Sequence, residues 1–470
     1  MKKNENKKEL DEMREQLLIQ KKNAYLTQDD ETIDKANEFC KGYMEFIDAS
    51  KTEREAVEYA VEAAKNRGFR ELKAGTALKP GDKVYSVNRG KAVILAVVGT
   101  ESLADGVRIV AAHIDSPRLD LKPVPLFETS ELAYLKTHYY GGIKKYQWTA
   151  IPLAMHGRVV RKDGSCLDIK LGEEPGEPQF CVTDLLPHLA AEQMKQPMTK
   201  AIEGENLNIL VGSRPIKGDK ASDLVKLNIM KLLHEKYNIT ETDFLSAELE
   251  IVPAFKASEI GFDRSMIGAY GHDDRVCAYP SLLAVLDSEA PKNTVVTVLA
   301  DKEETGSEGN TGLNSAYLEY FLADLAATQK VEVRTLLSHS VCLSADVNAG
   351  YDPTYPSVYE VNNSCFLNNG VVVTKYTGAR GKNDTSDASA ELMAQMRALF
   401  DGRDILWQTG ELGKVDAGGG GTVAKHIANL NVDVVDVGVP VLSMHSPFEV
   451  AAKMDIYMAY RAFDAFFRYE

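Results

Sequence analysis

The chain has 470 residues, of which 44% are hydrophobic and 26% charged, and its formal net charge is −15. This length exceeds what one hydrophobic core serves, so we expect two domains. The acidic balance argues against nucleic acid or an anionic membrane as the main partner. No stretch has the apolar length of a membrane span, and the charged N-terminus lacks the apolar segment of a signal peptide. Six cysteines without a C-x-x-C pair predict a cytoplasmic protein with reduced, buried thiols.

The first two elements predicted along the chain are helices. Apolar residues recur at helical spacing from Thr32 to Phe46. A second helix is expected to begin at Ser50, where Glu53 would complete a capping box, and to end at Gly68.

Short apolar runs then alternate with helical segments, a pattern typical of an α/β domain whose sheet is flanked by helices. The expected strands are Lys91–Gly99, Val107–His113, Thr294–Ala300, Val341–Ala345, Val371–Lys375 and Val432–Met444. The expected helices between several of these strands are Tyr279–Leu286, Thr311–Ala327, Ser386–Leu399 and Thr422–Ile427.

The middle of the chain has a different character. Residues 117–251 are rich in glycine, proline and charge, with short predicted strands, which indicates an inserted, mostly β domain. We therefore expect a catalytic domain in two parts, residues 1–116 and 252–470, interrupted by this β-rich domain.

Residues that can bind metals follow several of the predicted strands. In open α/β sheets, ligands bind outside the carboxyl ends of the strands, so side chains far apart in sequence would meet there. Asp273 and Asp274 lie just before a predicted helix. The residues at predicted strand ends are His113, Asp115, Asp301, Glu303, Glu304, Asp346 and His445.

Imidazole and carboxylate groups are ligands for zinc and related divalent metals. Two histidines and three carboxylates could hold two such ions, zinc or alternatively cobalt or manganese, if one carboxylate bridges them. Side chains of adjacent residues on an extended backbone point to opposite faces. One member of the Glu303–Glu304 pair should therefore bind metal, and the other should accept a proton from the attacking water.

The motifs "HIDSPRLDLKP", "GHDDRVCAYPSLLAV", "DKEETGSEG", "SADVNAGYDP" and "MHSPFE" occur in this order over most of the chain. Together they resemble the aspartyl aminopeptidase family of di-zinc metallopeptidases. The resemblance implies a zinc-peptidase α/β domain with a mixed sheet, interrupted by a β-rich dimerisation domain. It also implies a tetrahedral dodecamer built from dimers, and the removal of single N-terminal residues from peptides.

The resemblance also implies a role for each matching residue. The ligands of one metal ion would be His113 and Asp346, and those of the other ion would be Glu304 and His445. Asp273 would be a ligand of both ions. Asp115 would orient His113, and Glu303 would be the general base. His188 would reach a neighbouring subunit's site, and the Asp273–Asp274 peptide bond would be cis.

Substrate recognition is less defined. Family members specific for acidic residues carry "DRDL" after a glycine-rich turn, where this chain has "YGGIKKYQWTAIPLAMHG". Lys375, Arg380 and Lys382 could bind an acidic side chain. Gly419 and Gly420 could offer backbone N–H groups to a peptide. The released residue is therefore expected to be acidic or neutral.

Two other functions are compatible with such a site. A related di-metal carboxypeptidase or deacylase would use the same ligands but hold a different part of the substrate. A non-catalytic oligomeric scaffold would keep the fold without the reaction. The presence of Glu303 argues against the scaffold, which has no use for a general base.

Overall fold

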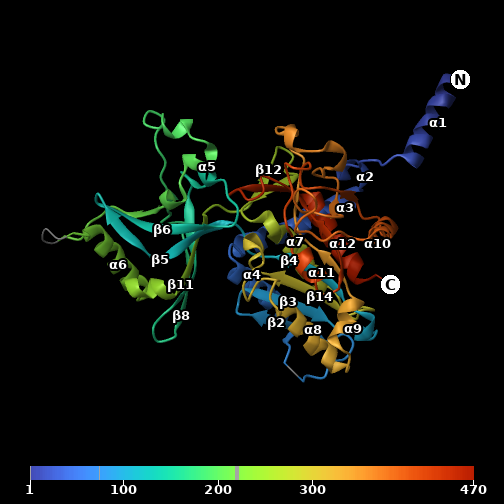
Figure 1. The fold of residues 1–470 in the computed structure, drawn as a ribbon, viewed down its shortest axis with the longest axis horizontal. Helices are drawn as coiled ribbons and strands as arrows, with labels where there is room; N and C mark the ends of the chain where they lie inside the picture. Colours follow the sequence, from blue (N-terminus) through green and yellow to red (C-terminus); the bar gives the residue numbers. More distant parts are fainter. Residues whose placement is uncertain (1, 74, 218–221, 470) are drawn as a thin grey trace.

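A computed structural model describes residues 2–73, 75–217 and 222–469 of the chain. Within this part, nine strands form a central mixed sheet in the main body of the molecule (Figure 1). In spatial order they are β1 (Arg70–Glu71), β2 (Lys83–Asn88), β3 (Ala92–Val97), β14 (Val295–Ala300), β4 (Arg108–His113), β15 (Val341–Ser344), β19 (Asp433–Gly438), β17 (Val371–Thr374) and β18 (Trp407–Thr409).

The middle of this sheet is parallel. Strands β14, β4, β15 and β19 run in one direction, whereas β3 and β17 pair antiparallel with this group at either side. Every residue of β3 and β14 is buried, as expected for strands covered on both faces. The four parallel strands consequently end at the same edge of the sheet.

Helices cover both faces of the central sheet. Helices α3, α4, α7, α10 and α12 share one hydrophobic core with it, and α8, α9 and α11 share another. Alternate residues of β3 enter opposite cores, Val93 and Leu95 on one side and Ile94 and Ala96 on the other. The helices are α1 (Lys2–Leu17), α2 (Ala24–Thr27), α3 (Asp30–Ala49), α4 (Glu53–Asn66), α5 (Met198–Ala201), α6 (Leu224–Tyr237), α7 (His272–Leu286), α8 (Tyr317–Thr328), α9 (Val333–Ser338), α10 (Ala390–Gly402), α11 (Ala424–Ala428) and α12 (Lys453–Phe467).

A second sheet, which we call the inserted sheet, lies to one side of the main body (Figure 1). In spatial order its strands are β8 (Cys166–Leu171), β7 (Leu153–Val160), β11 (Ala247–Pro253), β5 (Arg118–Thr129), β6 (Leu132–Tyr140), β10 (Ile209–Gly212) and β9 (Cys181–Val182). It has its own hydrophobic core, to which Val225 of α6 contributes. Helix α6 was not predicted, because its apolar residues do not form a clear stripe on one face.

A third, smaller sheet corrects one prediction. The expected strand Val432–Met444 is two strands, because β19 ends at Gly438 and the chain then leaves the central sheet. The third sheet consists of β12 (Ser258–Ile260), β13 (Met266–Ala269), β21 (Glu449–Ala452), β20 (Pro440–Leu442) and β16 (Asn348–Ala349). Pro440, which has no backbone N–H to donate, begins the new strand.

The capping box of α4 was predicted two residues too early. Thr52 is the N-cap, and its hydroxyl and the Glu55 carboxylate exchange hydrogen bonds with each other's backbone N–H. The Glu53 side chain cannot cap because it is buried against the Arg118 guanidinium, 3.1 Å away. Similarly, the segment expected to start a helix at Thr311 forms turns, and α8 begins only at Tyr317.

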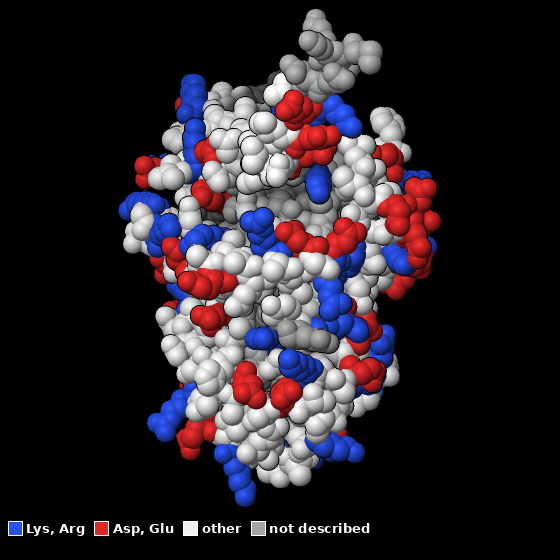
Figure 2. Space-filling model, turned by 90° about the vertical axis from the view of Figure 1, so that its right-hand side faces the viewer, with Lys and Arg blue, Asp and Glu red and all other residues white. Residues whose placement is uncertain are grey.

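The predictions about surface charge, cysteine burial and membrane spans can be compared with the structure. Figure 2 shows acidic and basic side chains interspersed over the face that it draws. Cys40, Cys277, Cys342 and Cys365 are buried, whereas Cys181 is partly exposed and Cys166 is exposed, so the prediction of buried thiols is wrong for these two. Among the described helices, none is both long and apolar enough to cross a membrane.

Candidate metal centre

The candidate site lies at the carboxyl edge of the central sheet. His113 is the last residue of β4, and the neighbouring strands β14 and β15 end shortly before Glu303 and Asp346. Because the three strands are parallel neighbours, these side chains converge as the sequence analysis expected. A fourth residue, Asp273, lies at the start of α7.

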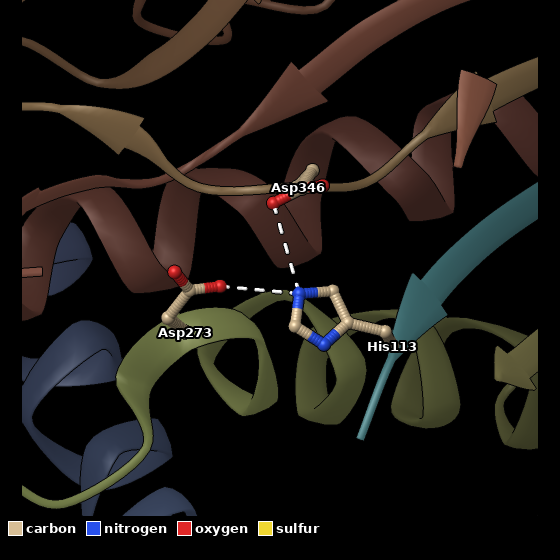
Figure 3. A group of neighbouring side chains, drawn as sticks. All are labelled: His113, Asp273 and Asp346. Atoms are coloured by element: carbon tan, nitrogen blue, oxygen red, sulfur yellow. Dashed lines mark hydrogen bonds and ion pairs between the residues drawn. The ribbon is translucent and has the colours of Figure 1, made fainter. Parts of the chain in front are cut away.

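Two groups of three side chains have the spacing to hold a metal ion, and Asp273 belongs to both. In the first group, His113 Nε2 lies 3.1 Å from Asp273 Oδ1 and 3.9 Å from Asp346 Oδ1 (Figure 3). In the second, His445 Nε2 lies 3.2 Å from Asp273 Oδ2 and 3.5 Å from Glu304 Oε2. Asp273 therefore presents one carboxylate oxygen to each histidine.

Both histidine rings are oriented through their other nitrogen. His113 Nδ1 lies 3.1 Å from the backbone oxygen of Asp115 and 3.3 Å from its carboxylate. His445 Nδ1 lies 2.7 Å from the backbone oxygen of Gly142. These acceptors require the proton to be on Nδ1, which leaves each Nε2 free to act as a ligand.

The fully buried Asp115 also orients the two glutamates that follow β14. Its carboxylate accepts the backbone N–H of Glu303 at 3.1 Å and that of Glu304 at 3.2 Å. It accepts the Tyr140 hydroxyl at 2.7 Å. One carboxylate thus holds a histidine of the first group and the backbone of a glutamate of the second.

Glu449 is a buried residue for which no role was predicted. It accepts the backbone N–H of Asp273 at 3.0 Å and that of His445 at 2.6 Å, so it joins both sides of the second group. The only signal in the sequence was its position at the end of "MHSPFE".

As expected, the Asp273–Asp274 peptide bond is cis.

Glu303 belongs to neither group of ligands. Its Oε2 lies 3.9 Å from His113 Nε2, and its side chain is 18% exposed, so it borders the site while remaining open to solvent. Burial raises the pKa of Glu303 to about 7. A carboxylate with a pKa near neutrality is suited to accept and return a proton.

The charges of the site fit divalent cations. Burial, together with repulsion from neighbouring carboxylates such as Asp273, raises the pKa of Glu304 well above its ordinary value. Burial and the nearby Asp274 have the same effect on the pKa of Asp346. Glu304 Oε1 is buried and has no hydrogen-bond partner among the described residues. Buried carboxylates are normally paired or coordinate a metal, and this set of imidazole and carboxylate donors suits a divalent cation.

The structure does not bring His188 to this site. It lies on an exposed segment after β9 of the inserted sheet, and its role in a neighbouring subunit's site, as the resemblance implies, stays a prediction.

The expected substrate-binding residues lie together in other loops. Arg380, Lys382 and Gly419 line a cavity of about 190 Å³. The backbone oxygen of Gly420 accepts the N–H of Gly378 at 2.7 Å. The charges of Lys375 and Lys382 are already paired, both with Asp387.

The fold and this set of converging histidines and carboxylates are typical of a metal-dependent hydrolase. Comparisons with known proteins specify it further. The family described as aminopeptidase I zinc metalloprotease (M18) matches residues 46–467. A probable M18 family aminopeptidase 1 from Clostridium acetobutylicum is 48% identical over 458 residues, covering 96% of this chain and 98% of that protein.

Solved structures agree with this match. An M18 aminopeptidase from Thermotoga maritima has a TM-score of 0.92 at 42% identity, covering 96% of this chain and 99% of that one. Aminopeptidase I from Clostridium acetobutylicum has a TM-score of 0.91 at 48% identity, covering 96% and 100%. The dodecamer of mApe1 from S. cerevisiae shares the fold, with a TM-score of 0.73 at 21% identity and coverage of 93% and 97%.

The chain therefore belongs to the M18 family of zinc metallopeptidases, which confirms the resemblance found in the sequence. It is an aminopeptidase that uses a metal cofactor.

Proposed function

We propose that this aminopeptidase holds two divalent ions, one with His113 and Asp346 and the other with His445 and Glu304, and that Asp273 bridges them. The observation that carries the proposal is the placement of the two Asp273 oxygens, 3.1 and 3.2 Å from the Nε2 atoms of two different histidines. A carboxylate that faces two oriented imidazoles in this way is arranged as a bridging ligand.

When bound, such ions lower the pKa of a water and polarise the carbonyl of the scissile peptide bond. Glu303 takes the proton of the attacking water on its carboxylate and delivers it to the leaving amine. Asp115 keeps Glu303 and Glu304 in their places through their backbone N–H groups. Zinc is the metal that best suits this mixed imidazole and carboxylate set, and the family description names it.

We infer a preference for neutral N-terminal residues over acidic ones. Lys375 and Lys382, two of the three basic residues that could bind an acidic side chain, both pair with Asp387. An acidic substrate would have to compete with this internal carboxylate. The segment that carries "DRDL" in acidic-specific members has a different sequence here.

We also propose that the active form is a cytoplasmic dodecamer in which His188 enters a neighbouring subunit's site. His188 is exposed, and exposed apolar side chains surround it in sequence. These are Leu185, Leu186, Leu189, Met194 and Met198, between 50% and 70% exposed. Large exposed apolar side chains gathered on one segment are typical of an interaction surface. The related mApe1 of S. cerevisiae is described as a dodecamer, and a tetrahedral arrangement of dimers would close such a shell.

A hydrolysis panel tests the reaction and its specificity. The metal-free protein would receive zinc, cobalt or manganese and then peptides that differ only in a free or acetylated N-terminus. We expect cleavage of the free-amine peptides only, faster for leucine than for aspartate at the first position. Cleavage of the acetylated peptides would contradict the proposal, and faster release of aspartate would overturn the neutral preference.

A further inference from the structure

The end of β6 connects the inserted sheet to both halves of the metal centre. The segment Tyr140–Gly142, which we call the junction segment, makes two contacts with residues that orient ligands. The Tyr140 hydroxyl donates to Asp115 Oδ2 at 2.7 Å, and the Gly142 backbone oxygen lies 2.7 Å from His445 Nδ1. The last residue of β6 and a glycine just beyond it thus contact residues that belong to, or orient, the two metal-binding groups in the other part of the chain.

The Tyr140 hydroxyl is important because of what Asp115 holds. Asp115 Oδ1 lies beside His113 Nδ1 and accepts the N–H of Glu303, while Oδ2 accepts the N–H of Glu304. The hydroxyl is the side-chain donor to Oδ2. Removing it would leave Oδ2 with the Glu304 N–H alone and would allow the carboxylate plane to rotate.

The Tyr140 ring packs against a guanidinium that is itself held by two ion pairs. The Arg118 guanidinium lies 4.1 Å from the ring centroid, and Arg118 is paired with Glu53 of α4 at 3.1 Å and with Glu250 of β11 at 3.3 Å. Arg118, Glu53 and Glu250 are nearly inaccessible to solvent. The ring is therefore fixed relative to a helix of the main body and a strand of the inserted sheet.

Gly141, between the two contacts, packs directly on a candidate ligand. Its φ is +72°, and an added Cβ would lie 3.2 Å from Glu304 Oε2 and 3.3 Å from Glu304 Cβ. A glycine suits this position for two reasons, since it tolerates positive φ and leaves the Glu304 side chain in place.

We propose that Tyr140 and Gly142 are positioning residues, through which the inserted sheet completes the outer hydrogen-bond shell of both metal sites. This inference rests on the proposed two-metal function. It gives the inserted sheet a role in the chemistry of its own subunit, separate from any role in assembly. Outer-shell partners of metal ligands typically change metal affinity or activity by about 10–100-fold when they are removed.

The first test compares Tyr140→Phe with Tyr139→Phe. Each variant loses one phenolic hydroxyl from the same strand, but Tyr139 is 40% exposed. For Tyr140→Phe we expect metal affinity, measured by competition with a chelator, to fall up to about 10-fold, the lower end of the range for direct partners of ligands, because Tyr140 acts through Asp115. We also expect an altered absorption spectrum of the cobalt-loaded protein and a lower kcat with little change in KM. Tyr139→Phe should match the unmodified protein in all three measurements.

A second pair of variants keeps the test independent of the tyrosine. Gly141→Ala and Gly164→Ala each add a methyl group at a similar positive φ, +72° and +84°. No non-neighbouring heavy atom lies within 4 Å of the Cβ added at Gly164. Backbone strain is therefore matched, and only Gly141→Ala presses on Glu304. Gly141→Ala should weaken binding of the metal at the His445 side, and Gly164→Ala should not.

Unchanged metal affinity and an unchanged cobalt spectrum in folded Tyr140→Phe and Gly141→Ala would overturn the inference. Tyr140→Phe could also keep normal metal affinity and lose activity only in proportion to its loss of folded protein. Tyr140 would then have a structural role alone. Failure of the two-metal proposal is a different outcome, because the unmodified protein itself would then bind fewer than two ions.

Discussion

At the scale of single residues, the site depends on carboxylates that each serve more than one partner. Asp115 holds His113 and the backbone of both glutamates, and Glu449 holds the backbone of Asp273 and of His445. Glu303 is the carboxylate at the site's edge that belongs to neither metal-binding group. This division separates the residues that would hold ions from the residue that would move a proton.

Replacing Glu303 with glutamine should remove the proton acceptor while leaving both ligand groups intact. We expect kcat to fall about 10²–10⁴-fold, because general-base catalysis contributes on this scale. Metal content should stay the same as in the unmodified protein. Steady-state kinetics and elemental analysis of one preparation would check both points, and near-normal turnover in the metal-loaded variant would exclude Glu303 as the base.

The bridging role of Asp273 leads to a prediction about metal stoichiometry. His445→Ala removes a ligand from one group, so the variant should retain one tightly bound ion. Asp273→Ala removes a ligand from both groups and should weaken both ions. Calorimetric titration of each metal-free variant with zinc would measure the number of sites. Equal stoichiometry in the two variants would argue against a bridge at Asp273.

The sequence allowed prediction of those site residues that follow strands, and fewer of the others. His113, Glu303 and Asp346 could be predicted because an apolar run followed by a polar ligand identifies a strand end. Gly142 and Tyr140 could not, because their contacts are with residues far away in sequence that another sheet brings near. A backbone oxygen leaves no trace in the residue type.

At the scale of secondary structure, buried central strands were predicted well and the helices around them less so. Strands β3 and β14 can be recognised in the sequence as nearly continuous apolar runs, because both faces of each strand are covered. The strand expected over Val432–Met444 was divided because the chain changes sheets at Gly438, whose added Cβ would overlap the Asp346 backbone oxygen. That close approach depends on tertiary structure, which periodicity does not report.

The junction between α4 and the inserted sheet depends on Arg118. Arg118→Met would leave the buried carboxylates of Glu53 and Glu250 without this partner. Breaking a buried pair in this way costs about 3–5 kcal/mol, and we expect the free energy of unfolding to fall by that amount. Denaturant titration followed by fluorescence would measure it.

Arg158→Met provides the matched control for this measurement. Arg158 pairs with Asp168, whose side chain is 62% exposed, so the loss should be below about 1 kcal/mol. Equal destabilisation by the two substitutions would show that burial of the Arg118 pairs does not determine the stability of this junction.

At the scale of the whole molecule, the inserted sheet projects from the main body (Figure 1). His188 lies on an exposed segment that follows β9 of this sheet. If His188 completes a neighbouring site, activity depends on assembly. Specific activity should then fall when the particle dissociates on dilution, as measured by light scattering and kinetics together. A monomer with undiminished specific activity would contradict the proposed assembly.

Mixing of two variants with impaired turnover examines the same idea at the level of subunits. His188→Ala should lower turnover about 10²-fold, the scale of losing one group that stabilises a transition state, without changing particle size. Mixed with Glu303→Gln under conditions of subunit exchange, it should regain activity, because some sites would combine an intact Glu303 with a neighbour's His188. No recovery despite proven exchange would place His188 outside the neighbouring site.

Anomalous diffraction at the zinc edge, from crystals of the zinc-loaded protein, tests the central claim most directly. The account predicts two peaks about 3.5–4 Å apart, one ligated by His113 and Asp346 and the other by His445 and Glu304, with Asp273 contacting both. A single peak in a fully active preparation, or two ions held by other residues, would contradict it.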